Sequence, residues 1–118
     1  MQHTSIISAD RVTGTNVYNT AGDKIGHVEK VLLDKYSGTV AYALMSFGGF
    51  LGIGAKYHPL PWGTLKYDTG KEGYVVDVDK RTLENAPTVD SYEGALWADE
   101  AWNRRVYDYY RYPPFWGL

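Results

Sequence analysis

The chain contains no cysteine, and this absence removes several kinds of chemistry at once. Disulfides, thiolate zinc sites and thiol nucleophiles all need that side chain. A lack of cysteine also fits a reducing compartment. At 118 residues the chain is predicted to form one domain, large enough to hold a hydrophobic core without covalent cross-links.

An excess of charge of either sign is also missing. Lysine and arginine together number 12 and aspartate and glutamate 14, so the net charge is -2. The longest basic runs are two pairs, Lys80-Arg81 and Arg104-Arg105. Nucleic acid binding depends on clustered positive charge that displaces counterions. We therefore expect no nucleic acid partner.

Long apolar runs are absent as well. No stretch approaches the roughly 20 apolar residues of a membrane-spanning helix. Residues 1–7 carry neither the charged lead nor the apolar core of a secretory signal. We expect a soluble cytoplasmic protein that does not insert into membranes.

Frequent glycines divide the first 90 residues into short apolar segments. Short strands between closely spaced turns are typical of an all-β sandwich or barrel. We expect strands over residues 16–18, 25–34, 40–47 and 73–79, and one helical turn over 80–85. Another strand contains Pro59 and Pro61, and because proline cannot donate to a ladder we place it at an edge.

Two of these strands have informative patterns. In the 25–34 strand the apolar residues change phase after Val28, and a β-bulge near Glu29 and Lys30 would return Val31 and Leu33 to the inner face. The 40–47 strand is apolar on both faces. Such a strand is central in its sheet or is covered by another element.

The composition changes after Asp90, because residues 91–118 hold nine aromatic side chains. Over residues 98–111 the apolar residues recur with a helical period, which predicts a helix that ends before Pro113. The residues of this stripe are Trp102, Val106, Tyr109 and Tyr110.

A series of short motifs runs through the first 90 residues. The motifs are Val12-Thr13-Gly14 with Val17, Gly22-Asp23-Lys24-Ile25-Gly26 with Val28, Asp34 with Ser37-Gly38 and Val40, residues 46–54, Pro61-Trp62, Leu65, and Leu83 with Ala86-Pro87. Their order and spacing over about residues 5–90 resemble those of the PRC-barrel domain family. The short aromatic tail resembles that of stand-alone bacterial members.

This resemblance implies an all-β fold: a small six-stranded PRC-type β-barrel over residues 1–90, with a short aromatic-rich C-terminal helical tail over 91–118. In the family, the barrel forms the cytoplasmic part of the H subunit of photosynthetic reaction centres. It also forms the C-terminal domain of a ribosome maturation factor that binds a ribosomal protein. Both roles are docking roles, and no functional residue of either relative is matched in this sequence. The resemblance thus implies the fold and a bias toward protein–protein contact.

Three groups of residues suggest chemistry without establishing it. The glycine cluster over residues 48–54 lacks the flanking order of a phosphate-binding loop. His27 and Glu29 share a strand face, but a metal site needs three or four converging ligands. Asp77 and Asp79 lack a third carboxylate and are interpreted as the solvated face of an edge strand. We therefore predict no catalytic residue, no metal and no cofactor.

The aromatic tail allows two interpretations. As a lid, its helix covers an open end of the barrel; as an interface, it contacts a partner, since Trp and Tyr are enriched at binding hot spots. We expect a non-enzymatic interaction domain that forms a homodimer and docks a protein partner. The alternative is a small-molecule-binding barrel with an aromatic pocket between barrel and tail. The candidate interaction residues are Trp97, Trp102, Val106, Tyr109, Tyr110, Phe115 and Trp116.

Overall fold

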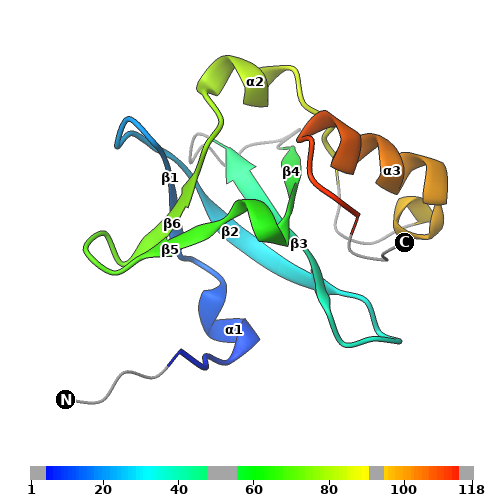
Figure 1. Ribbon diagram of the computed structural model, residues 1–118, viewed down its shortest axis with the longest axis horizontal. Helices are drawn as coiled ribbons and strands as arrows, with labels where there is room; N and C mark the ends of the chain where they lie inside the picture. The colour runs from blue at the N-terminus through cyan, green and yellow to red at the C-terminus, as the bar shows by residue number, and fades with distance from the viewer. Residues whose placement is uncertain (1–4, 48–55, 91–94, 115–118) are drawn as a thin grey trace.

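Six strands form one sheet in a computed structural model that describes residues 5–47, 56–90 and 95–114. The strand order is β4-β3-β2-β1-β6-β5, in which β1 and β6 are parallel and the other neighbours antiparallel (Figure 1). The strands are β1 (Asn16–Asn19), β2 (Lys24–Leu33), β3 (Val40–Phe47), β4 (Tyr57–Pro61), β5 (Lys66–Asp68) and β6 (Gly73–Val76). The helices are α1 (Ala9–Val12), α2 (Lys80–Glu84) and α3 (Glu100–Tyr109), with 3-10 turns η1 (Trp62–Thr64) and η2 (Ala95–Ala98).

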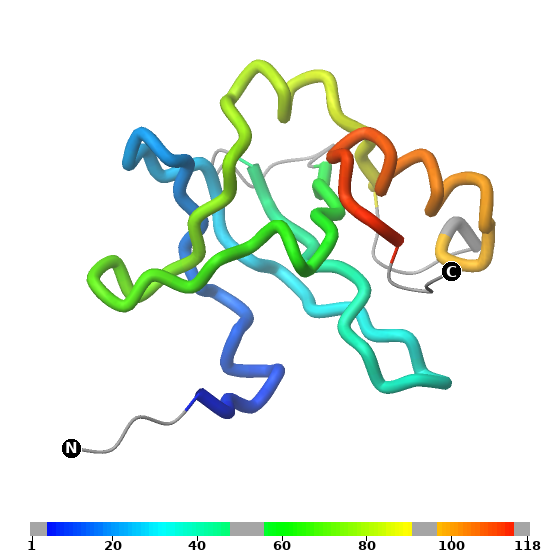
Figure 2. The backbone as a smooth tube through the Cα atoms, viewed as in Figure 1, coloured from blue at the N-terminus to red at the C-terminus, as the bar shows by residue number. Residues whose placement is uncertain are grey.

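The sheet is strongly curled but is not closed. Its two edge strands, β4 and β5, are separated in sequence only by residues 62–65. In a flat six-stranded sheet the edges would lie about 24 Å apart, whereas a connection of this length spans at most about 18 Å. The sheet must therefore curl. The backbone tube in Figure 2 shows this curvature. Six strands were predicted, but a closed barrel is not confirmed, because no ladder joins β4 to β5 within the described residues.

The predicted β-bulge in β2 is confirmed. The register against β3 shifts between Val28 and Lys30, so Glu29 is the extra residue. Val31 then packs against the main core. A second register shift directly precedes Leu33, whose side chain is 54% exposed. The prediction that Leu33 faces inward is therefore wrong.

Strand β3 is covered on both sides, as its two-sided apolar pattern predicts. Ala43 and Met45 are fully buried in the main core. Tyr42 belongs to a second cluster with Val106 and Tyr107 of α3. The C-terminal helix therefore packs against the sheet on the side of β3, as Figure 1 shows.

Strand β4 lies at an edge, as its two prolines predict. The edge is partly occupied, because Tyr57 and Val89 exchange two backbone hydrogen bonds of 2.9 Å each. Helix α3 also contacts β4 (Figure 1).

Strand β6 ends at Val76, earlier than predicted. The reason is that Asp79 caps the next helix: its Oδ1 accepts a hydrogen bond from the backbone N–H of Thr82 at 2.7 Å. This bond lowers the pKa of Asp79. The interpretation of Asp77 and Asp79 as one strand face is therefore wrong, whereas the helical turn predicted over 80–85 is confirmed as α2.

His58 is 5% exposed and contacts α2. Its Nε2–H donates to the backbone carbonyl of Leu83 at 2.8 Å, and within the described residues its Nδ1 has no hydrogen-bond partner. Phe47 packs edge-on against the ring, with centroids 5.4 Å apart. Protonation would place a charge in this apolar site, so burial lowers the pKa of His58, and the bond to Leu83 offsets only part of the effect.

We expect the free energy of unfolding to fall as the pH drops below the ordinary histidine pKa of 6.5. Below that value the unfolded chain takes up a proton on His58 that the folded chain resists. Above it both states hold the neutral ring, and this contribution stays constant. Urea unfolding of the wild type and of His58→Gln across this range checks the expectation, which requires a flatter pH dependence in the variant. Equal slopes in the two proteins would contradict it.

Candidate functional site

Val106 anchors the tail helix on the sheet. It is fully buried in a cluster with Ala41 and Tyr42. Tyr107 donates its hydroxyl to the carbonyl of Ala41 at 2.5 Å, and the hydroxyl of Tyr42 donates to Asn103 Oδ1 at 2.6 Å. Burial raises the pKa of both tyrosines, so they remain protonated donors. An apolar contact and two hydrogen bonds thus fix one face of α3 to β3.

The C-terminal turn of α3 is held by different contacts. Tyr109 donates its hydroxyl to the carbonyl of Thr82 in α2 at 2.6 Å. Tyr110 packs against the main core. Tyr112 lies over Gly63 of η1, where any side chain would overlap the tyrosine hydroxyl. Three of the predicted interaction residues, Val106, Tyr109 and Tyr110, therefore pack within the chain and hold the tail on β3, α2 and the main core.

The other predicted interaction residues divide into two sets. Trp97 and Trp102 are half-buried, with ring centroids 5.5 Å apart, and Trp97 also lies 5.5 Å from Tyr42. Phe115 and Trp116 lie outside the described residues, as does the glycine cluster over 48–54. The two tryptophans thus remain near the surface, at the place where the tail meets β3.

An apolar groove of about 560 Å³ lies at this place, between the β2–β3 hairpin and the tail. We call it the hairpin groove. The lining side chains that matter here are Leu32, Leu33, Tyr36, Tyr42 and Trp97. Leu33 is 54% exposed and Tyr36 90%. Large exposed apolar side chains beside a groove are typical of interaction sites.

The turn at the tip of the hairpin presents Tyr36 to solvent. Asp34 accepts hydrogen bonds from the hydroxyl of Ser37 at 2.7 Å and from its backbone N–H at 3.3 Å. Gly38 has φ +77°, a conformation that glycine adopts without strain. The sequence identifies this segment as a turn, but the exposed aromatic within it is the feature that marks a surface.

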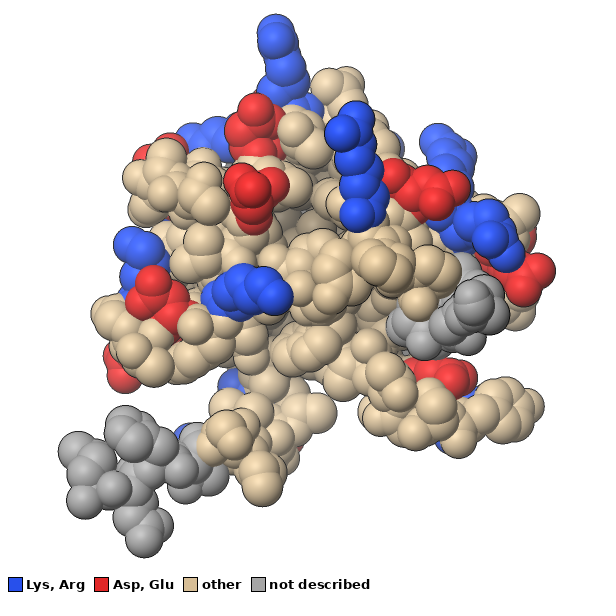
Figure 3. Space-filling model, viewed as in Figure 1, with Lys and Arg blue, Asp and Glu red and all other residues tan. Residues whose placement is uncertain are grey.

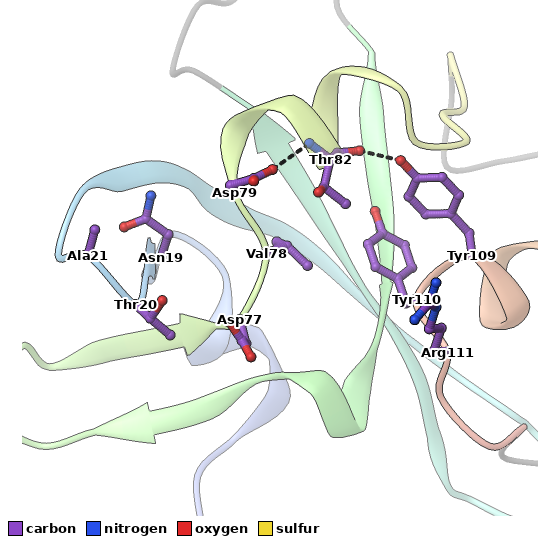
Figure 4. Close-up of a pocket in the computed structure, with 10 residues that line it drawn as sticks. All are labelled: Asn19, Thr20, Ala21, Asp77, Val78, Asp79, Thr82, Tyr109, Tyr110 and Arg111. Carbon is purple, nitrogen blue, oxygen red and sulfur yellow. Dashed lines mark hydrogen bonds between the residues drawn. The ribbon is translucent and has the colours of Figure 1, made fainter.

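A second hollow, of about 620 Å³, lies between the sheet and the end of the tail (Figure 4). We call it the tail pocket. Its lining residues are Asn19, Thr20, Ala21, Asp77, Val78, Asp79, Thr82, Tyr109, Tyr110 and Arg111. Figure 4 shows the turn after β1 on one side and the end of α3 on the other, with Val78 between them. The lining is mostly polar, not the aromatic wall that the alternative hypothesis describes.

Tyr110 is the unusual residue of the tail pocket. Its hydroxyl is buried and has no hydrogen-bond partner within the described residues. Figure 4 shows that hydroxyl directed toward α2. Burial raises the pKa of Tyr110, so the group is a protonated donor. A buried donor without an acceptor carries a free-energy cost that a bound ligand can relieve.

The residues considered for metal binding do not form a larger cluster. His27 Nε2 lies 3.3 Å from Glu29 Oε1, and both side chains are about a quarter exposed. Across residues 5–47, 56–90 and 95–114, no group of three or more potential metal ligands is found. On the face that Figure 3 draws, basic and acidic side chains are interspersed. Of the described helices, none combines the length and apolar character that a membrane span requires.

Comparison with known proteins gives a family match. The PRC-barrel domain, as a family model, matches residues 5–83 of this chain. The matched segment contains all six strands and most of α2, and it ends before α3. No curated protein matches the sequence.

We expect Val106→Ala to lower the free energy of unfolding by about 2 kcal/mol, because it removes two buried methyl groups and leaves a cavity under α3. Arg105→Ala is the matched control, since its side chain is exposed on the same helix. Chemical denaturation of both variants measures the difference. Equal stability of Val106→Ala and the wild type would show that the tail does not act as a lid.

Proposed function

Because the chain belongs to the PRC-barrel domain family, we propose that it is a non-enzymatic interaction domain of the bacterial cytoplasm, which self-associates and docks a protein partner. Family membership also supports describing the curled sheet as a six-stranded barrel. The observation that carries the docking function is the hairpin groove with its exposed rim.

The hairpin groove supports docking because its two large exposed apolar side chains contribute little to the core. Leu33 and Tyr36 are large and apolar, yet they contribute little to the core, since more than half of each side chain is exposed. Trp97 and Tyr42 form the floor beside them, already ordered by their ring contact. A preformed apolar groove lowers the conformational cost of binding.

The chemistry of the groove defines the kind of partner. Its walls suit aliphatic or aromatic side chains, which release water when they bind. Asp34 and Lys35 at the rim carry opposite charges, so they favour no single charge on the partner. The proposed partner is therefore a protein that presents a short apolar segment, and its affinity comes from a few central side chains.

Leu33→Asp is expected to abolish capture of the partner by the tagged protein, because it places a charge among the apolar side chains that line the groove. Ile6→Asp is the matched control, since Ile6 is 86% exposed and lies outside the groove. Quantitative mass spectrometry of cross-linked complexes compares both variants with the wild type, after thermal melts confirm that both are folded. A protein lost with Leu33→Asp and kept with Ile6→Asp supports the proposal. Capture that is unchanged in both variants contradicts it.

A second function is favoured by the buried hydroxyl of Tyr110 in the tail pocket. The volume of the pocket, about 620 Å³, is within the usual range for small-molecule sites. Asp77 and Asp79 on one part of the lining and Arg111 on another offer charges of both signs. These groups suit a small zwitterionic molecule that also accepts a hydrogen bond from Tyr110.

We expect a panel of free amino acids to contain at least one that raises the thermal midpoint of the wild type. A ligand at 100 times its dissociation constant stabilises the folded state by about 2.7 kcal/mol. Tyr110→Phe should lose this shift, because it removes the hydroxyl and keeps the ring in the core. Tyr18→Phe, whose side chain is outside the pocket lining, is the control. No shift with any member of the panel would remove this second candidate.

A further inference from the structure

The two edges of the sheet differ in what they offer to another chain. The edge at β4 carries two prolines without N–H groups and is bonded to Val89. The edge at β5 pairs with β6 on one side, and no strand among the described residues pairs with its other side. An unpaired edge strand is a template for pairing with another chain.

The sequence of β5 is complementary to itself. Lys66 and Asp68 lie on one face of the strand and Tyr67 on the other. If two copies pair antiparallel about a two-fold axis through Tyr67, each Lys66 faces Asp68 of the other copy. Opposite charges across antiparallel strands stabilise the pair. Asp68 uses Oδ1 to accept the backbone N–H of Lys71 at 3.0 Å, which leaves its second oxygen for the lysine.

A row of aromatic rings leads to the same axis. Trp62 and Tyr74 have centroids 5.6 Å apart, and Tyr74 and Tyr67 have centroids 5.3 Å apart. Tyr67 is the last ring of the row and is 56% exposed. Because Tyr67 is directly opposite Tyr74 in the β5–β6 register, the next position across the axis is Tyr67 of the second copy. Pairing at β5 would thus continue the row and cover the exposed ring.

We propose that a second copy of this chain pairs with β5, which makes one continuous sheet across a symmetric dimer. This inference rests on the self-association proposed above and assigns its surface. The interface is isologous, with the same three residues contributed by each copy. The competing explanation is that Lys66 and Asp68 only protect the edge from pairing, as charged residues do on many edge strands.

A mixing experiment with charge reversals tests the pairing. Lys66→Glu alone places two acidic side chains opposite each other at each end of the strand, and Asp68→Lys alone places two basic ones there. Each variant should dimerise about tenfold or more weakly than the wild type. An equimolar mixture of the two should recover wild-type association, because the opposed charges are then complementary. Sedimentation equilibrium measures all three samples and the wild type.

A cross-linking experiment tests the axis itself. The chain has no cysteine, so Tyr67→Cys carries a single thiol that lies beside its own symmetry mate. A short bifunctional maleimide should join two copies of this variant efficiently. Tyr36→Cys is the matched control, with its thiol on the hairpin tip, and should give only the background of random collisions.

The outcomes separate the inference from the function on which it rests. Weak association of each charge variant with recovery in the mixture, together with cross-linking at position 67, supports pairing at β5. A wild-type dimer that neither charge reversal weakens, or a mixture that does not recover, overturns the β5 assignment and leaves self-association standing. A wild type that is monomeric at every concentration overturns self-association and the β5 assignment together.

Discussion

The short connection between β4 and β5 is the constraint on which the rest of the structure depends. Residues 62–65 join strands at opposite edges of a six-stranded sheet, so the sheet has to curl until its edges approach each other. Curling places side chains from one face of the longer strands inside, where Val17, Val28 and Leu60 are fully buried. The outer face of β3 and the outer side of β5 are left without cover from the sheet itself. The tail covers β3, whereas no strand among the described residues pairs with the outer side of β5, where we propose that a second copy binds.

The tail packs several of its aromatic residues against the sheet and the core of its own chain. Tyr42 projects from the outer face of β3 and would otherwise be an exposed aromatic. Val106 and Tyr107 cover it, and Tyr109 and Tyr110 connect the end of the helix to α2 and to the main core. Val106, Tyr109 and Tyr110 belong to the stripe that helical periodicity predicts, whereas Tyr107 does not. The docking surface that we propose lies beside the tail, where the hairpin groove combines Trp97 with side chains from β2.

Local patterns predicted much of the fold, and the errors arose where a local pattern allowed two structures. The phase change after Val28 predicted the bulge, and the prolines of β4 predicted an edge strand. Each of these sequence patterns is compatible with only one local structure. The alternation around Asp77 was consistent with a strand. Asp79, however, is three residues before Thr82, which is the spacing of a helix N-cap, and in the structure Asp79 caps α2. For the candidate site, periodicity identified Val106, Tyr109 and Tyr110 among the packed residues of the tail but omitted the buried Tyr107. The hairpin groove was missed, because it joins side chains from β2 and η2 that are far apart in sequence.

Amide hydrogen exchange on dilute and concentrated protein distinguishes a tail that packs within one chain from a tail that forms the contact between copies, and it also reports pairing at β5. We expect the amides of α3 to be protected equally at both concentrations, because the contacts of Val106 and Tyr107 lie within one chain. Those amides of residues 66–68 that point away from β6 should become protected only in the concentrated sample. Protection of α3 that appears on concentration, with β5 unchanged, would contradict the account and make the tail the interface.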